Sequence, residues 1–395
     1  RIVEVEVQGR RIYLFYTMLL LCMSGLLGIT ITGDAFNLFV FLEISSLSTY
    51  VLISLGNDRR ALTAAYRYLI VGTIGATFYI IGVGLLYMST GSLNITDLAR
   101  LVPALFDSRT VQAAMAFLTL GLSIKAAVFP LHLWMPNAYT YAPSAVTVFL
   151  AATATKVAIY ALIRVVFTIF GGVGLFDAFG VNNTLMAMAI IAMLAGSLVA
   201  LYQGNIKRML AYSSIAQIGY IVLGLSLDSV TGVTAGIVHL FNHALTKGGL
   251  FMAMGCVAMM LGSVRLDDMA GLGKRMPITM AAFVAGGLSL IGVPLTVGFI
   301  SKWYLIKAAL EQGSVLIAML IVFSSLIAVA YVWRVVEVAY FRQPADASAS
   351  VREAPASMLI PMLILIGASV YFGIDASITL DVAGAAAAAL MGAAG

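Results

Sequence analysis

Seven ionisable side chains of this sequence lie inside strongly apolar stretches. A charge at such a depth in hydrocarbon costs about 3 kcal/mol or more, so an intramembrane charge usually has a partner or a function. A buried amine gives up its proton more readily than one in water, and a neighbouring carboxylate opposes that loss. Side chains of this kind could take up protons and pass them along bridging water. The seven are Glu43, Lys125, Lys156, His239, His243, Lys247 and Lys302.

The two lysines Lys125 and Lys156 lie on either side of a stretch that contains Pro130, Pro136 and Pro143. Proline removes a helical hydrogen bond, so the helix must break between the lysines. Irregular backbone at membrane depth survives only where it is buried in protein or lines a wet cavity. The stretch therefore predicts a polar path built on a broken helix.

Spacing and charge relate the other candidates to one another. His239, His243 and Lys247 follow at i, i+4 and i+8, which places all three on one helix face. Glu43 needs a cation nearby, and we expect that cation to be Lys125, with Lys156 as the next proton carrier.

Each of these features also has a purely structural interpretation. The carboxylate and its lysine could form a salt bridge that only stabilises the fold, and the histidine row could only hold two helices together by hydrogen bonds. A lysine near a helix end can extend to the membrane surface. Polar residues gather on the lysine-bearing segments, which favours a hydrated path: Thr153, Thr155, Ser213, Ser214, Gln217, Asn242 and Thr246.

Composition identifies the class of protein. Of the 395 residues, 62% are hydrophobic and only 10% are charged, and the mean hydropathy is +1.04. Because soluble domains carry roughly 25% charged residues, we predict an all-α polytopic protein of the lipid bilayer and exclude a soluble enzyme. The net charge of +5 comes from basic loops and indicates no nucleic-acid partner. The two cysteines form no CxxC pair and no nucleotide-type glycine loop is present, so we expect no cofactor and no metal.

Apolar stretches long enough to cross about 30 Å of hydrocarbon predict about 11 transmembrane helices. The ninth is interrupted at Gly292-Val293-Pro294, and the Ala/Gly-rich tail 376–395 either continues the last helix or is unstructured. The expected spans are 12–32, 35–56, 63–89, 110–130, 143–168, 183–203, 210–226, 231–261, 278–310, 314–341 and 356–373.

Loop charges give the orientation. With eleven spans, one membrane face collects 12 basic residues and the other only Arg100 and Arg109. The positive-inside rule then places the first face, and the N-terminal end of the chain, in the cytoplasm. The residues of the basic face are Arg1, Arg10, Arg11, Arg59, Arg60, Lys207, Arg208, Arg265, Lys274, Arg275, Arg342 and Arg352.

The spans divide into two sets of five, at residues 1–170 and 182–341, followed by a final helix at 356–373 and the tail at 376–395. A set with an odd number of spans inverts the set that follows it, and inverted repeats with broken helices are common in transporters. The fourth span of each set carries a proline, Pro130 or Pro294, beside a lysine. We therefore predict two inverted five-helix repeats.

Six segments carry a resemblance to a known family. The chain resembles the antiporter-like membrane subunits of respiratory complex I, membrane-bound hydrogenases and Mrp-type Na+/H+ antiporters. Its TGDAFNLFVFLE string, together with 90–99 and 155–164, is most similar to the D-type subunit of the Mrp antiporters. The matching segments are 32–52, 125–146, 155–164, 205–220, 239–251 and 288–310.

The resemblance implies a function and a setting. It implies proton translocation along the seven residues named above, without a redox centre of the chain's own, in a multisubunit complex of the inner (plasma) membrane. Protons, and Na+ for an Mrp-type antiporter, would be the transported ions, and other membrane subunits the partners. It also implies that the family's first three spans are missing here, in agreement with a sequence that starts at Arg1.

Two departures from the family pattern affect local geometry. Ser144 follows Ala142-Pro143 where the family usually has proline, and the second break reads Val293-Pro294-Leu295. Neither departure removes a charged residue. Two alternatives to an Mrp-type antiporter subunit stay open: a proton-pumping subunit of an NADH–quinone oxidoreductase or hydrogenase, and a scaffold whose channel is vestigial.

Overall fold

A computed structural model describes residues 2–171, 181–343 and 351–392. Across these residues the chain is helical apart from turns and two isolated bridges. Nine of the described helices are long and apolar enough to cross a membrane. The other two of the eleven predicted spans are the interrupted ones, whose halves are each too short alone. The all-α polytopic fold is thus confirmed.

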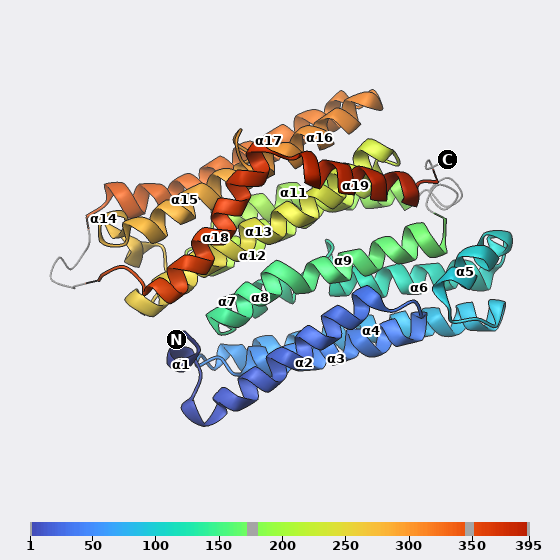
Figure 1. The fold of residues 1–395 in the computed structure, drawn as a ribbon, viewed down its shortest axis with the longest axis horizontal. Coiled ribbons are helices and arrows are strands. Elements are labelled where there is room, and N and C mark those ends of the chain that lie inside the picture. Colours follow the sequence, from blue (N-terminus) through green and yellow to red (C-terminus); the bar gives the residue numbers. More distant parts are fainter. Residues whose placement is uncertain (1, 172–180, 344–350, 393–395) are drawn as a thin grey trace. The chain divides into compact units, whose positions relative to one another are not determined.

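The chain divides into two compact units (Figure 1). The first unit comprises Glu6–Pro143, Thr153–Thr184 and Ala388–Gly395, and the second comprises Arg1–Val5, Ser144–Ala152 and Leu185–Ala387. The main helices of the first unit are α2 (Ile12–Ile31), α3 (Ala35–Ser54), α4 (Arg60–Thr90), α5 (Ile95–Leu101), α6 (Arg109–Lys125), α7 (Met135–Tyr141) and α9 (Thr155–Ile163).

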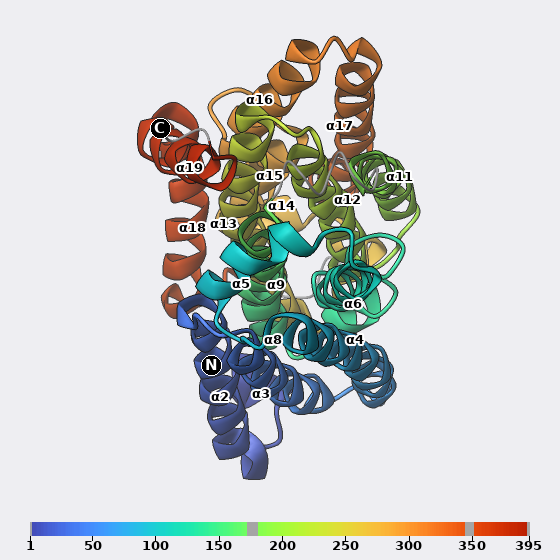
Figure 2. The same ribbon diagram turned by 90° about the vertical axis from the view of Figure 1, so that its right-hand side faces the viewer.

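The second unit holds most of the C-terminal half. In Figure 2, α18 runs beside α13, in agreement with their contacts. The predicted tail forms a separate helix, α19, beyond a bend at Asp375. The helices are α8 (Ser144–Phe149), α11 (Val181–Leu201), α12 (Ile206–Ser226), α13 (Val230–Leu261), α14 (Leu272–Arg275), α15 (Pro277–Ile291), α16 (Val297–Glu311), α17 (Val315–Val336), α18 (Ala356–Ile374) and α19 (Ser377–Leu390).

The first break lies between α6 and α7, at the prolines that predict it. Helix α6 ends at Lys125, and Ala127 adopts a positive φ of 54° before a cis Phe129–Pro130 bond. The Trp134 indole N–H donates to the carbonyl of Ile124 at 2.9 Å, which gives this carbonyl at the end of α6 a second donor besides the Ala127 N–H. The break therefore holds Lys125 at a helix end inside the unit.

Close packing of α4 on α6 fixes the position of Lys125 along α6. A Cβ atom at Gly121 would lie 2.5 Å from the carbonyl oxygen of Gly75, so only glycine allows the two backbones to approach this closely. Gly121 lies one turn before Lys125, which is thereby held against the helices of the first unit.

The two units share several internal features. The long helices α4 and α13 end at left-handed glycines, Gly91 and Gly262. The loop after each helix pairs with the loop before an earlier helix, through the bridges Asp34–Asn94 and Asn205–Arg265. Each unit thus contains the same pairing of two loops through backbone hydrogen bonds, although the sequences of the loops differ.

The second break separates α15 from α16, at residues 292–296. Gly292 takes a φ of 90°, in the left-handed region that glycine favours, and closes α15 with a hydrogen bond from its N–H to Leu288 O. Proline therefore marked both broken spans correctly, and both breaks lie next to a buried lysine.

The other end of α15 is capped from a distant part of the chain. The carboxylate of Glu353 accepts hydrogen bonds from the backbone N–H groups of Ile278 and Thr279, at 2.8 and 3.3 Å, and from the Thr279 hydroxyl. These are first-turn donors that have no partner within the helix. The acidic group also lies at the positive end of the helix dipole.

We expect Glu353→Ala to lower the free energy of unfolding by about 1–2 kcal/mol, the usual cost of losing a helix cap. A lower melting temperature of the detergent-solubilised protein would measure the loss. Glu311→Ala is the matched control, because Glu311 forms an exposed pair with Lys307 and such pairs contribute little. Equal melting temperatures for the two variants would contradict the cap.

Candidate functional site

The predicted partner of Glu43 is present in the structure. Lys125 Nζ lies 3.2 Å from Glu43 Oε1 and donates to Ser46 Oγ at 2.6 Å, with the Tyr50 hydroxyl at 3.5 Å. The lysine side chain is only 4% exposed, whereas that of Glu43 is 22% exposed. Glu43, Ser46 and Tyr50 lie one turn apart along α3, so one helix face supplies every one of these contacts.

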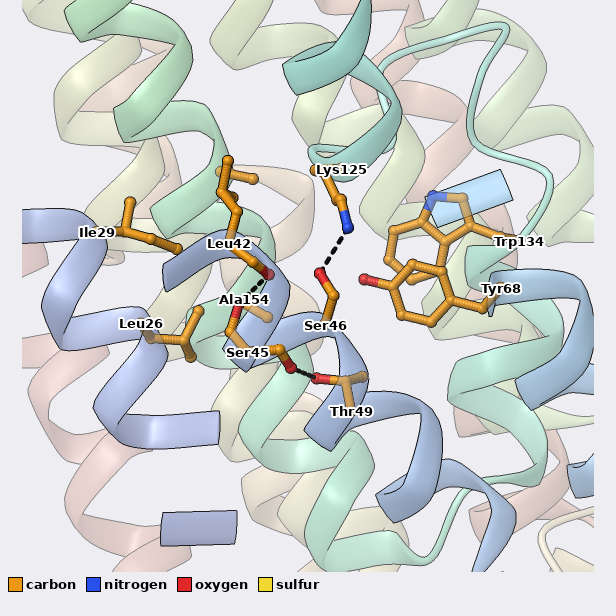
Figure 3. A pocket seen from close by; sticks show the side chains of 11 residues that line it. Leu26, Ile29, Leu42, Ser45, Ser46, Thr49, Tyr68, Lys125, Trp134 and Ala154 are labelled. Carbon is orange, nitrogen blue, oxygen red and sulfur yellow. Dashed lines mark hydrogen bonds between the residues drawn. The ribbon is translucent and has the colours of Figure 1, made fainter. Parts of the chain in front are cut away.

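A small cavity lies beside this pair. In Figure 3 the Lys125 amine points at the Ser46 hydroxyl, with the rings of Tyr68 and Trp134 alongside. These rings are stacked at 3.8 Å between centroids. The cavity measures about 20 Å³, and a cavity of this size holds about one water molecule. Ala154 and Ala158 line its far wall, two residues either side of Lys156.

Lys156 lies in the second position of α9, immediately after a π-helical segment at Leu150–Ala154. Its side chain is buried, and Nζ donates to Thr155 Oγ1 at 3.3 Å. π-Helical segments occur often at functional sites. Sequence patterns do not reveal such a segment, so its position directly before Lys156 is new information from the structure.

The other four predicted residues lie together in the second unit, against α12. Lys247 is fully buried on α13, and its Nζ donates to the Leu210 carbonyl at 2.8 Å and, at close range, to the Ser213 hydroxyl. His239, two turns earlier on α13, contacts Gln217 of α12 through Nε2 at 3.0 Å. The other ring nitrogen, Nδ1, lies 2.8 Å from Ser301 Oγ.

The two histidines stack one turn apart, as their spacing predicts. The ring centroids of His239 and His243 are 6.4 Å apart, with only 15° between the planes. The Gln217 amide oxygen can only accept, so Nε2 of His239 donates to it, whereas the Ser301 hydroxyl beside Nδ1 can either donate or accept.

Lys302 lies on α16, one residue after the serine that contacts His239. Its Nζ donates to the carbonyls of Leu290 and Ile291 at 2.8 and 3.0 Å, and to Ser325 Oγ at 3.0 Å. The two carbonyls belong to the last turn of α15, whose negative dipole end attracts a cation. The Tyr220 ring of α12 covers the amine at 4.7 Å.

Helix α12 is therefore the common support of the four predicted residues in the second unit, which we call the second group: His239, His243, Lys247 and Lys302. Its residues Leu210, Ser213, Gln217 and Tyr220 follow at helical spacing and contact, in turn, Lys247, His239 and Lys302. The side chains of the two polar residues are buried. Ser213 and Gln217 were individually weak signals in the sequence, and only the packing assigns each a charged partner.

One buried cation was missed by sequence reasoning. Lys207 was placed in a basic loop, but α12 begins at Ile206, four residues before the predicted span, and the Lys207 side chain is only 5% exposed. The Asn205 side chain caps this earlier start by accepting from the Arg208 N–H. Asparagine before a helix is a readable cap signal, so the sequence did contain the clue.

Comparison with known proteins adds three findings. Residues 32–328 match the family described as NADH:quinone oxidoreductase/Mrp antiporter, TM. The chain is 48% identical over 366 residues to NADH-quinone oxidoreductase subunit N of Desulforudis audaxviator, covering 89% of this chain and 72% of that protein. It is 29% identical over 360 residues to the D-type subunit of the Na(+)/H(+) antiporter of Bacillus subtilis, covering 91% and 72%.

A solved structure agrees with these relatives. A chain of the Mrp complex from Dietzia sp. DQ12-45-1b superposes with a TM-score of 0.88 at 29% identity, covering 95% of this chain and 78% of that one. The fold described above is thus one that occurs in multisubunit membrane complexes.

Proposed function

We propose, on the premise that this chain belongs to the NADH:quinone oxidoreductase/Mrp antiporter transmembrane family, that it translocates protons through the membrane by way of its buried Glu, Lys and His residues. It is a multi-pass, antiporter-like membrane subunit. The observation that carries the proposal is the Glu43–Lys125 pair, in which a nearly unexposed lysine and a partly exposed carboxylate meet beside a water-sized cavity.

Each unit supports one part of the proposed path. In the first unit, Glu43 is the more exposed partner and would receive the proton, Lys125 would exchange it, and the cavity wall leads to the helix that carries Lys156. In the second unit, Lys247, His239 and Lys302 each have a hydroxyl partner, and a hydroxyl can accept one proton while donating another.

We also propose that the two sets of five spans are inverted repeats. Several parallels support this arrangement: a broken fourth span beside a lysine in each set, long helices ending at Gly91 and Gly262, and one loop-to-loop bridge in each unit. In addition, the fifth span of each set ends in a π-helical turn, at Arg164–Ile169 and Glu337–Phe341.

Two complexes are candidates for the assembly. The 48% identity with a subunit N favours a redox-driven pump, in which other subunits carry the redox centres. The match to an Mrp complex at a TM-score of 0.88, and the similarity to a D-type antiporter subunit, support the Na+/H+ antiporter expected from the sequence motifs. In either case we place the complex in the plasma membrane, with the basic face of the chain in the cytoplasm.

The complex itself provides the test. An affinity tag on this chain, followed by purification of the assembly and mass spectrometry, would return iron–sulfur subunits for a redox pump or short Mrp-type membrane subunits for an antiporter. The purified complex in vesicles should then generate a pH gradient on electron transfer, or exchange Na+ for protons. A complex that does neither would support the scaffold interpretation and contradict proton translocation.

A further inference from the structure

The buried cation Lys207 lies at the start of the helix that supports the second group. Its Nζ donates to Ser144 Oγ at 2.7 Å, and Ser144 is itself 1% exposed. Both residues belong to the second unit. A lysine held in this way loses much of its hydration, and such a residue within a span is a functional candidate by default.

A cavity lies on the other side of Ser144. It has a volume of about 210 Å³, room for several water molecules, and Ser144 and Ser357 are the polar residues of an otherwise apolar lining. Gly255 of α13 and Pro361 of α18 form part of its walls. Because α18 begins at Ala356 and α13 ends at Leu261, the cavity lies near helix ends, at the face of the unit where α12 also begins.

Helix α12 connects Lys207 with Lys247. The Leu210 carbonyl, which accepts from Lys247 Nζ, is three residues after Lys207 on α12, or about 4.5 Å along the helix axis. Ser213, the second partner of Lys247, follows one turn later. Helix α12 thus carries both Lys207, whose partner Ser144 lines the cavity, and two acceptors of Lys247.

We propose that Lys207 and Ser144 form a second proton access route, which leads from the cavity to Lys247. This inference rests on the proposed function. The Lys207 ammonium gives a proton to the Lys247 amine through water, so one N–H bond breaks and another forms. The Ser144 hydroxyl then passes its proton to Lys207 and takes another from a hydronium ion in the cavity, which leaves a neutral water molecule behind.

Two variants of Lys207 separate the effect of its positive charge from the effect of its ability to release a proton. Arginine keeps the charge but does not give up its proton in proteins, whereas histidine titrates near neutrality. In vesicles that contain the whole complex, Lys207→Arg should slow proton translocation at least tenfold, and Lys207→His should retain most of it. Lys274→Gln, at an exposed residue of the same basic face, is the control and should be unchanged.

The outcomes distinguish this route from the proposed function. If Lys207→Arg translocates at the normal rate, or if Lys207→His is as slow as Lys207→Arg, then Lys207 only ties α12 to α8 and the route is wrong. In that case Lys247→Met should still stop translocation. If Lys247→Met is also without effect, the proposed function itself fails.

A labelling experiment tests the cavity independently of any change at Lys207. In a Cys22→Ala/Cys256→Ala background, which removes both native cysteines, Ser357→Cys places a thiol in the cavity wall. A membrane-impermeant cationic thiosulfonate should modify this thiol from the basic face only, and should slow translocation several-fold. Met319→Cys, on the apolar outer face of α17, should stay unmodified. An unmodified Ser357→Cys would overturn the access route.

Discussion

Replacement of Lys125 by methionine is expected to stop proton translocation and also to lower the melting temperature of the complex. The substitution removes the amine that contacts Glu43 and Ser46, and leaves the carboxylate of Glu43 without the cation that lies 3.2 Å away. Removing one partner of a fully buried pair costs about 3–5 kcal/mol. Since the Glu43 side chain is 22% exposed, water offsets part of that loss, and we expect about 1–3 kcal/mol.

A second substitution separates the structural effect from the functional one. Glu43→Gln in the Lys125→Met background removes the uncompensated charge, so the melting temperature should recover while translocation stays absent. Pyranine fluorescence in vesicles reports translocation, and light scattering of the solubilised complex reports melting. If the double variant translocated protons, the pair would be only a salt bridge that stabilises the fold.

Replacement of Lys247 by methionine should stop translocation without lowering the melting temperature. Lys247 is fully buried, and its two acceptors stay hydrogen-bonded without it: the hydroxyls of Ser213 and Ser214 both donate to the Leu210 carbonyl. Methionine has a similar volume and fills the site. Exchange of a buried ionic group for a well-packed apolar one is often neutral, or stabilising by about 1–4 kcal/mol.

The Lys125→Met and Lys247→Met variants form a matched pair, because they are expected to differ in melting temperature. Both variants should lose translocation at least tenfold, but only Lys125→Met should melt earlier. Ser213→Ala removes a hydroxyl partner of Lys247 and leaves the amine, so it should slow translocation less than Lys247→Met does. A Lys247→Met complex that translocates normally would remove this residue from the proton path.

The breaks and the first ion pair followed from the sequence because their causes are local. Proline cannot donate a backbone hydrogen bond, so Pro130 and Pro294 mark interruptions whatever surrounds them. A carboxylate in an apolar stretch requires a cation, and Lys125 was the nearest candidate on a broken span. The eleven spans followed from length and hydropathy in the same way.

The environment of the second group did not follow from the sequence, because it depends on which helix faces pack together. Nothing in the spacing of His239 assigns it to Gln217 or Ser301, which lie 22 and 62 residues away. Lys207 was missed for a different reason. Because hydropathy is averaged over a window, the adjacent charges of Lys207 and Arg208 predict a loop. The Asn205 cap nevertheless starts the helix before them.

The contacts of Lys302 link its protonation to the geometry of the second break. An ammonium group carries three hydrogens, and three acceptors surround this one: two carbonyls from the end of α15 and the hydroxyl of Ser325. After a proton leaves, two hydrogens remain for three acceptors, and the attraction between the cation and the helix end is lost. Loss of a proton from Lys302 would thus leave the joint between α15 and α16 one hydrogen short, so the protonation state of this lysine and the geometry of the second break are linked.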